Sequence, residues 1–146
     1  MSFMHLEVLT VEGAVLSADV SAVTANTATG QISILPGHVP LVTLLTPGEL
    51  KVRREHEESL LFVSGGFLEV ASEDIFILAD ACEYAAEIDI ERAEAARRRA
   101  EDLLKAASYE IDAAAAEAAL RRSLARLRVA GHHRRATIDN LPRLSE

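Results

Sequence analysis

The segment Ile88-Asp89-Ile90-Glu91-Arg92-Ala93 marks the point at which the chain changes from one kind of structure to another. Before it, short apolar runs alternate with turn residues, as in a β-domain. After it, apolar residues recur at helical spacing. Asp89 can cap this helix, because its carboxylate can accept a hydrogen bond from a free N–H group of the first turn and lies at the positive end of the helix dipole. From these six residues alone, a domain junction with a capped helix is a better explanation than a binding site.

The residues before this junction predict an all-β domain. Turn signals lie at Glu12-Gly13, Thr29-Gly30, Pro36-Gly37 and Pro47-Gly48, where proline fixes φ or glycine permits a positive φ. About nine short strands are expected, and the clearest of them span residues 3–9, 20–25, 31–35, 39–45, 49–54, 59–63, 67–71 and 75–79. Short strands with turns at regular spacing are typical of a sandwich or a barrel.

The residues after the junction predict two helices. The first helix carries a narrow seam of mostly small residues, Ala93, Ala96, Ala100, Leu103 and Ala107. A loop is expected over 108–112. The second helix carries the stripe Ala113, Ala116, Leu120, Leu124, Leu127 and Ala130, and Gly131 is expected to end it. Two helices with so short a loop pack as an antiparallel hairpin, and residues 131–146 are expected to form a mobile tail.

Composition narrows the possible classes of protein. The chain has 146 residues, 49% hydrophobic and 26% charged, which is ordinary for a soluble domain. We expect neither a signal peptide at the N-terminus nor a membrane-spanning run. Cys82 is the only cysteine, so no internal disulfide is possible, and a cytoplasmic protein is expected.

The two halves of the chain differ in charge. The net charge is −8, but residues 1–87 carry 3 basic and 13 acidic side chains, whereas residues 88–146 carry 12 and 10. The first half should therefore repel nucleic acid, which binds proteins through its phosphates. An anionic partner is expected to bind the second half.

Four arginines suggest where such a partner could bind. Arg92 and Arg99 lie on one face of the first helix, and Arg122 and Arg126 lie on one face of the second. In an antiparallel hairpin the four guanidinium groups could converge, a geometry suited to phosphate oxygens. The alternative is a solvated face with ordinary ion pairs at i,i+4, namely Glu94–Arg98, Glu101–Lys105 and Glu117–Arg121. From the residues alone, the solvated face remains the better explanation.

Catalytic motifs are lacking. The sequence has no Gly-rich loop ending in Lys-Ser/Thr and no G-x-S-x-G elbow. His38 lies in a turn and is read as a structural or interface residue. The adjacent His132 and His133 point to different faces of a helix, so no metal site is expected there. An enzyme is therefore not expected.

Three motifs resemble the epsilon subunit of bacterial F-type ATP synthases. They are Ile34-Leu35-Pro36-Gly37-His38-Val39-Pro40-Leu41, Val63-Ser64-Gly65-Gly66-Phe67-Leu68-Glu69-Val70 and Ile77-Leu78-Ala79-Asp80. The resemblance covers about residues 3–130. It implies an α+β fold: a flattened antiparallel β-sandwich of about ten strands over residues 1–84, then a two-helix hairpin over 88–130.

The resemblance also implies a function. The β-domain would dock on the gamma subunit and the c-ring of the rotor, with Gln31 and His38 among the contacts. The hairpin would inhibit ATP hydrolysis by reaching the catalytic beta (and alpha) subunits. The protein would be a non-catalytic rotor subunit, located at the cytoplasmic face of the bacterial plasma membrane as a peripheral part of the complex.

Some members of this family bind ATP on the folded hairpin, as a regulatory ligand rather than a catalytic cofactor. Their motif is Ile or Leu, Asp, two variable residues, Arg and Ala, and it matches Ile88, Asp89, Arg92 and Ala93. The family's further nucleotide contacts correspond to Glu83, Arg99, Arg122 and Arg126. The resemblance therefore predicts an ATP site on these residues.

Two alternatives stay open. The first is a purely structural coupling subunit whose arginines never bind nucleotide. The second is an unrelated enzyme that uses Ser64 or His38.

Overall fold

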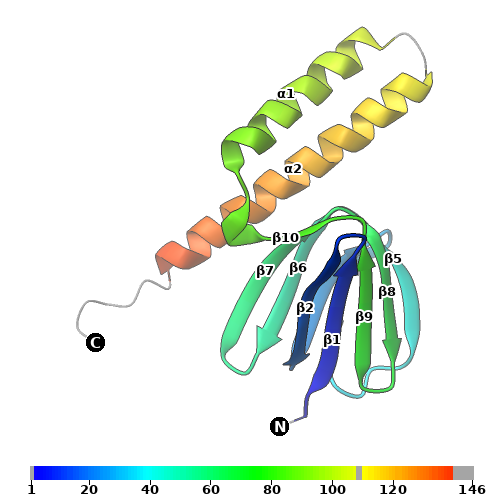
Figure 1. Ribbon diagram of the computed structural model, residues 1–146, viewed down its shortest axis with the longest axis vertical. Helices are drawn as coiled ribbons and strands as arrows, with labels where there is room; N and C mark the ends of the chain where they lie inside the picture. The colour runs from blue at the N-terminus through cyan, green and yellow to red at the C-terminus, as the bar shows by residue number, and fades with distance from the viewer. Residues whose placement is uncertain (1, 108–109, 140–146) are drawn as a thin grey trace. The chain divides into compact units, whose positions relative to one another are not determined.

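The computed structural model describes residues 2–107 and 110–139. The chain divides into two compact units, Met1–Tyr84 and Ala85–Glu146, which are drawn in Figure 1. The first unit is made of strands and the second of helices. The predicted α+β fold, a β-sandwich followed by a helical hairpin, is thereby confirmed.

The first unit contains ten strands: β1 (Met4–Thr10), β2 (Gly13–Val20), β3 (Ala22–Thr27), β4 (Gly30–Ile34), β5 (Leu41–Leu45), β6 (Gly48–Arg54), β7 (Glu57–Val63), β8 (Gly66–Ala71), β9 (Asp74–Ala79) and β10 (Cys82–Tyr84). Two of them, β2 and β10, are not among the strands singled out in the sequence. Most of β2 is half-buried or exposed, so it lacks a clear alternation. The strand β10 has only three residues, too few for a pattern.

The strands follow the order β10-β7-β6-β3-β5-β8-β9-β1-β2, with β4 paired to β3. Their pairs are antiparallel except that β1 runs parallel to β9, as the arrows in Figure 1 show. The strands β3 and β5 share a single residue pair, Thr27 with Leu45. This narrow junction lets the sheet fold over into two layers around one core.

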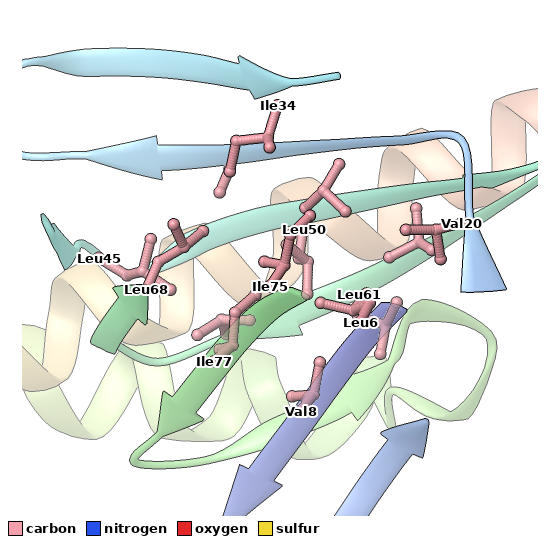
Figure 2. Close-up of a cluster of buried hydrophobic side chains, with 14 of the residues drawn as sticks. Leu6, Val8, Val20, Ile34, Leu45, Leu50, Leu61, Leu68, Ile75 and Ile77 are labelled. Carbon is pink, nitrogen blue, oxygen red and sulfur yellow. The ribbon is translucent and has the colours of Figure 1, made fainter. Parts of the chain in front are cut away.

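The core of this unit is built from aliphatic side chains on the inner faces of both layers. Figure 2 shows Leu6, Val8, Ile75 and Ile77 from neighbouring strands, and all four are almost completely inaccessible to solvent. Their alternation with outward residues follows from the two-residue period of a strand. Burying one such side chain contributes about 1.5–3 kcal/mol, so this cluster supplies much of the stability of the unit.

The second unit contains a short 3-10 helix, η1 (Ala85–Glu87), and two long helices, α1 (Ile90–Ala106) and α2 (Glu110–Asp139). Asp89 is the N-cap of α1, as its sequence predicts. The helices α1 and α2 lie side by side (Figure 1). Small buried residues face the partner helix: Ala93 and Ala100 on α1, and Ala116, Ser123 and Ala130 on α2. Their size lets the two backbones approach closely. Among the described residues, no helix is both long and apolar enough to cross a lipid bilayer.

Three expectations about the helices are wrong. The helix α2 continues through Gly131 to Asp139, so Gly131 does not end it. Glycine costs only about 1 kcal/mol relative to alanine inside a helix, and the preceding Val129 and Ala130 are buried. The break between the helices is shorter than predicted, because α2 already begins at Glu110. Residues 140–146, part of the predicted mobile tail, lie outside the described residues.

The third wrong expectation is the burial of two leucines. The apolar stripes include Leu103 and Leu124, but these side chains are 62% and 41% exposed. The buried positions of α2 are instead occupied by the small residues Ala116, Ser123 and Ala130, which are spaced seven apart. Their short side chains allow the two helices to pack more closely than leucines would. The ion pairs on α1 also differ from the prediction. Glu94 and Glu101 are both paired with Arg97, each at 2.8 Å, and not with Arg98 and Lys105 as expected.

Candidate functional site

A pocket of about 240 Å³ lies between α1 and α2. It is lined by Ala96, Arg99, Ala100 and Leu103 from α1, and by Ala119, Arg122, Ser123 and Arg126 from α2. Four of these lining residues are small, namely Ala96, Ala100, Ala119 and Ser123, and their short side chains leave space between the helices. The antiparallel packing thus brings three of the four predicted arginines to one place.

The pocket is strongly basic. Three guanidinium groups line it and none of its eight lining residues is acidic. Within residues 2–107 and 110–134, no carboxylate lies within 4 Å of the guanidinium nitrogens of Arg99 or Arg122. The guanidinium groups of Arg99 and Arg122 therefore favour an anionic ligand, because each offers several hydrogen-bond donors in a fixed plane.

Ser123 is the other polar residue of the pocket. It is buried, and its hydroxyl donates a hydrogen bond to the carbonyl of Ala119 at 3.0 Å. The hydroxyl hydrogen is therefore already used within α2, and the arginines are left as the donors for a ligand. The pocket can hold an anion mainly through charge-assisted bonds.

The residues of the predicted ATP motif have local structural roles. The Asp89 side chain accepts a hydrogen bond from the backbone N–H of Arg92 at 3.1 Å, which satisfies a free donor of the first turn of α1. Ile88 and Ala93 are buried. The Arg92 side chain is exposed and does not line the pocket. Three of the four motif residues therefore stabilise the start of α1.

Glu83, the remaining predicted ATP contact, lies on β10 in the first unit, where it pairs with Phe62 of β7. Its neighbour Cys82 is half-buried beside the core. Burial, and to a smaller extent the charge of Glu83, raises the pKa of the Cys82 thiol to about 11. Cys82 is therefore a neutral thiol at physiological pH and has no features of a reactive cysteine.

The two predicted subunit contacts lie on the β-domain. Gln31 is exposed on β4, where it pairs with Asn26 of β3. His38 is half-buried in the turn before β5, and its ring Nδ1 lies 2.6 Å from the carbonyl oxygen of Val39. That contact holds the ring through the local backbone, and the interface role of His38 stays a prediction.

The strands β5, β8 and β9 carry an exposed apolar face that the sequence predictions do not include. Leu44 pairs with Phe67, and Phe67 pairs with Leu78, so the three side chains form one row. Val42 and Phe76 lie on the same face, and all five are exposed. The signal was present in the sequence: residues 75–79, and residues 41–45 apart from Thr43, are apolar on both faces, as in strands covered on both sides.

Comparison with known proteins identifies the family. The family model described as "ATP synthase, Delta/Epsilon chain, beta-sandwich domain" matches residues 3–85. The model described as "ATP synthase, Delta/Epsilon chain, long alpha-helix domain" matches residues 86–131. The chain belongs to the ATP synthase delta/epsilon chain family. The resemblance seen in the sequence is confirmed, and the chain is a non-catalytic subunit of ATP synthase.

Bacterial epsilon chains are similar over almost their whole length. The ATP synthase epsilon chain of Pelotomaculum thermopropionicum is 49% identical over 127 residues, which cover 87% of this chain and 95% of that one. The epsilon chain of Bacillus subtilis is 44% identical over 131 residues, which cover 90% and 99%. These relatives are all called epsilon rather than delta chains.

Solved structures share the fold. A chain of the Euglena gracilis mitochondrial ATP synthase, determined as an OSCP/F1/c-ring assembly, superimposes with a TM-score of 0.77 at 26% identity. The match covers 85% of this chain and 79% of that chain. A chain of the Tetrahymena thermophila mitochondrial ATP synthase gives a TM-score of 0.56 at 20% identity, over 89% and 95% of the two chains.

Proposed function

We propose that the chain is the regulatory rotor subunit of a bacterial proton-translocating ATP synthase. Its β-domain docks on the gamma subunit and the c-ring, and its helical hairpin inhibits ATP hydrolysis and binds ATP when folded. The related Euglena chain belongs to an assembly that contains F1 and a c-ring, which supports a place in the same complex. The chain would then lie at the cytoplasmic face of the plasma membrane as a peripheral subunit.

The observation that carries the nucleotide part of the proposal is the arginine pocket. Arg99, Arg122 and Arg126 come from two different helices and line one pocket, and no acidic residue lines it with them. The like charges of the three guanidinium groups repel one another, so a polyanion between the helices would relieve the repulsion and make charge-assisted hydrogen bonds to both helices. Such a ligand stabilises the paired arrangement of α1 and α2.

Binding of this kind acts as a switch through linkage. The pocket exists only when α1 and α2 pack together, so a ligand of the pocket prefers the folded hairpin over any extended form. It shifts the population toward the folded state by no more than its differential affinity for the two states. High ATP would then hold the hairpin away from the catalytic subunits and permit hydrolysis.

The docking part of the proposal is supported by the β-domain. The row Leu44, Phe67 and Leu78 exposes large apolar side chains on neighbouring strands. Exposed apolar patches on soluble domains commonly mark protein–protein contacts. We assign this face to the contact with the gamma subunit, and Gln31 with the His38 turn to contacts near the c-ring.

A purely structural coupling subunit is the second candidate. The observation that favours it is that Ile88, Asp89 and Ala93 are fully explained by the start of α1. If this candidate is correct, Arg122→Ala in the assembled complex leaves the response of ATP hydrolysis to ATP concentration unchanged.

The experiment that tests the proposal compares the wild-type assembled complex with three variants of it. Truncation of the chain after Glu87 should leave assembly intact and raise ATP hydrolysis. Arg122→Ala should shift the ATP concentration at which inhibition is relieved to higher values. The matched control is Arg121→Ala, an exposed arginine beside Arg122 that does not line the pocket, and it should respond as wild type does. Unchanged hydrolysis after truncation would contradict the inhibitory role.

A further inference from the structure

We propose that the pocket between α1 and α2 binds the phosphate chain of its ligand in metal-free form, so that Mg²⁺ competes with binding. This inference rests on the proposed function, because it assumes that the pocket takes a nucleotide. It concerns the ionic form of the ligand, which neither the fold nor the family membership defines. Three properties of the pocket carry it.

The first property is the lack of ligands for a divalent cation. Sites that bind Mg²⁺ with nucleotide phosphates supply one or two carboxylates to the metal. None of the pocket residues is acidic. Glu101 and Asp102 follow Arg99 closely along α1 but do not line the pocket, and Glu101 is paired with Arg97 at 2.8 Å. In the part of the chain that the structure describes, no three His, Cys, Asp or Glu side chains are grouped as a metal site requires.

The second property is that guanidinium groups can neutralise the phosphate charge, which a metal ion does in other nucleotide sites. Arginine stays charged at every accessible pH and binds phosphate oxygens in pairs. Arg99 faces Arg122 and Arg126 across the pocket, so the helices can contact the phosphates from both sides. A bound Mg²⁺ would neutralise part of the phosphate charge and occupy oxygens that these groups would bind. Metal and arginines therefore compete for the same atoms.

The third property is size. The pocket volume of about 240 Å³ lies below the range of roughly 300–1,000 Å³ that is usual for sites enclosing a small molecule. It can hold a short phosphate chain but cannot enclose a whole nucleotide. The charge state of the phosphates should therefore dominate the affinity, and the nucleoside lies largely outside the pocket.

The test is a calorimetric titration of the full chain with ATP, once with EDTA and once with excess MgCl₂ at equal ionic strength. We expect the dissociation constant to be lower in EDTA by roughly tenfold, the difference that one charge-assisted hydrogen bond makes. Inorganic tripolyphosphate should displace ATP in EDTA. Arg122→Ala should lose most of the metal-free binding, and the control Arg121→Ala should retain both the binding and its sensitivity to Mg²⁺.

The outcomes separate this inference from the function on which it rests. ATP binding that is equal in the two buffers, or tighter with Mg²⁺, would overturn the inference and leave the proposed ATP site intact. ATP binding in neither buffer would overturn both. Tripolyphosphate that fails to displace ATP would also contradict the inference, because it would show that the nucleoside carries the affinity.

Discussion

Asp89 and Arg92 are linked by a hydrogen bond of 3.1 Å from the backbone N–H of Arg92 to Oδ1 of Asp89. The two residues belong to the motif that predicts an ATP site, yet the bond uses the backbone of Arg92 and leaves its guanidinium exposed. The aspartate therefore has a role in the structure that needs no ligand. Its contribution to helix stability can be measured separately from nucleotide binding.

Replacing Asp89 should destabilise the helical unit. Asp89→Ala removes the side-chain acceptor at the N-cap of α1, which costs about 1 kcal/mol. Asp89→Asn keeps a good cap and should lose much less. Urea denaturation followed by far-UV circular dichroism, without nucleotide, measures the difference. Equal free energies of unfolding for Asp89→Ala and wild type would show that the cap is not needed.

Gly66 should not tolerate a side chain. Its φ is +139°, and a Cβ there would overlap the carbonyl oxygen of Leu78 and lie 2.8 Å from the Cα of Ala79. Gly66→Ala should therefore destabilise the fold in two ways. An alanine at this positive φ is strained by roughly 1–3 kcal/mol, and its Cβ also clashes with the backbone of β9. Gly37→Ala is the matched control, because Gly37 also has a positive φ, +85°, but has nothing within 4 Å of its Cβ position. Thermal unfolding should show a clearly larger loss for Gly66→Ala.

Cys82 should make the stability of the β-domain depend on pH in the alkaline range. Its pKa is raised from the ordinary value of 9.0 to about 11 in the folded chain, mainly because of burial. The unfolded chain loses this proton first, so the stabilising effect of the buried neutral thiol is complete below pH 9 and is lost as the pH rises toward 11. Chemical denaturation across this range should show a fall in stability that is smaller in Cys82→Ala. The same fall in both proteins would contradict the assignment.

The apolar face of the β-domain should carry part of the affinity for the gamma subunit. Phe67 is 54% exposed in the middle of the row with Leu44 and Leu78. Phe67→Glu should weaken binding to the gamma subunit with little change in stability, because the side chain is outside the core. Val11→Glu is the control, since Val11 is 93% exposed but lies in the turn between β1 and β2. Equal losses of binding in both variants would argue against this face.

Much of the fold could be predicted because local signals agree with it. Glycine turns such as Gly13 and Gly30 have the positive φ that their positions suggest. Asp89 caps α1 as expected. The parallel pairing of β1 with β9 could not be predicted, since it joins strands far apart in the sequence. The passage of α2 through Gly131 was missed because the packing of Val129 and Ala130 outweighs the weak preference of one glycine.

The site was predictable to a similar degree. Helical spacing and antiparallel packing place Arg99 beside Arg122 and Arg126, and the structure has them around one pocket. The same spacing also put Arg92 in the group, but its side chain does not reach the pocket, which lies further along α1. The exposure of Leu103 was not predicted, because helical periodicity shows which residues share the apolar face but not how deeply each of them is buried.

The measurement that tests the central claim most directly is calorimetric titration of the chain with ATP in EDTA. The account predicts saturable one-to-one binding that is lost in Arg122→Ala and retained in Arg121→Ala. That pattern would make the arginine pocket of the hairpin the nucleotide sensor of the subunit. No binding at millimolar ATP, or the same binding in both variants, would contradict the account and leave a subunit whose hairpin does not respond to ATP.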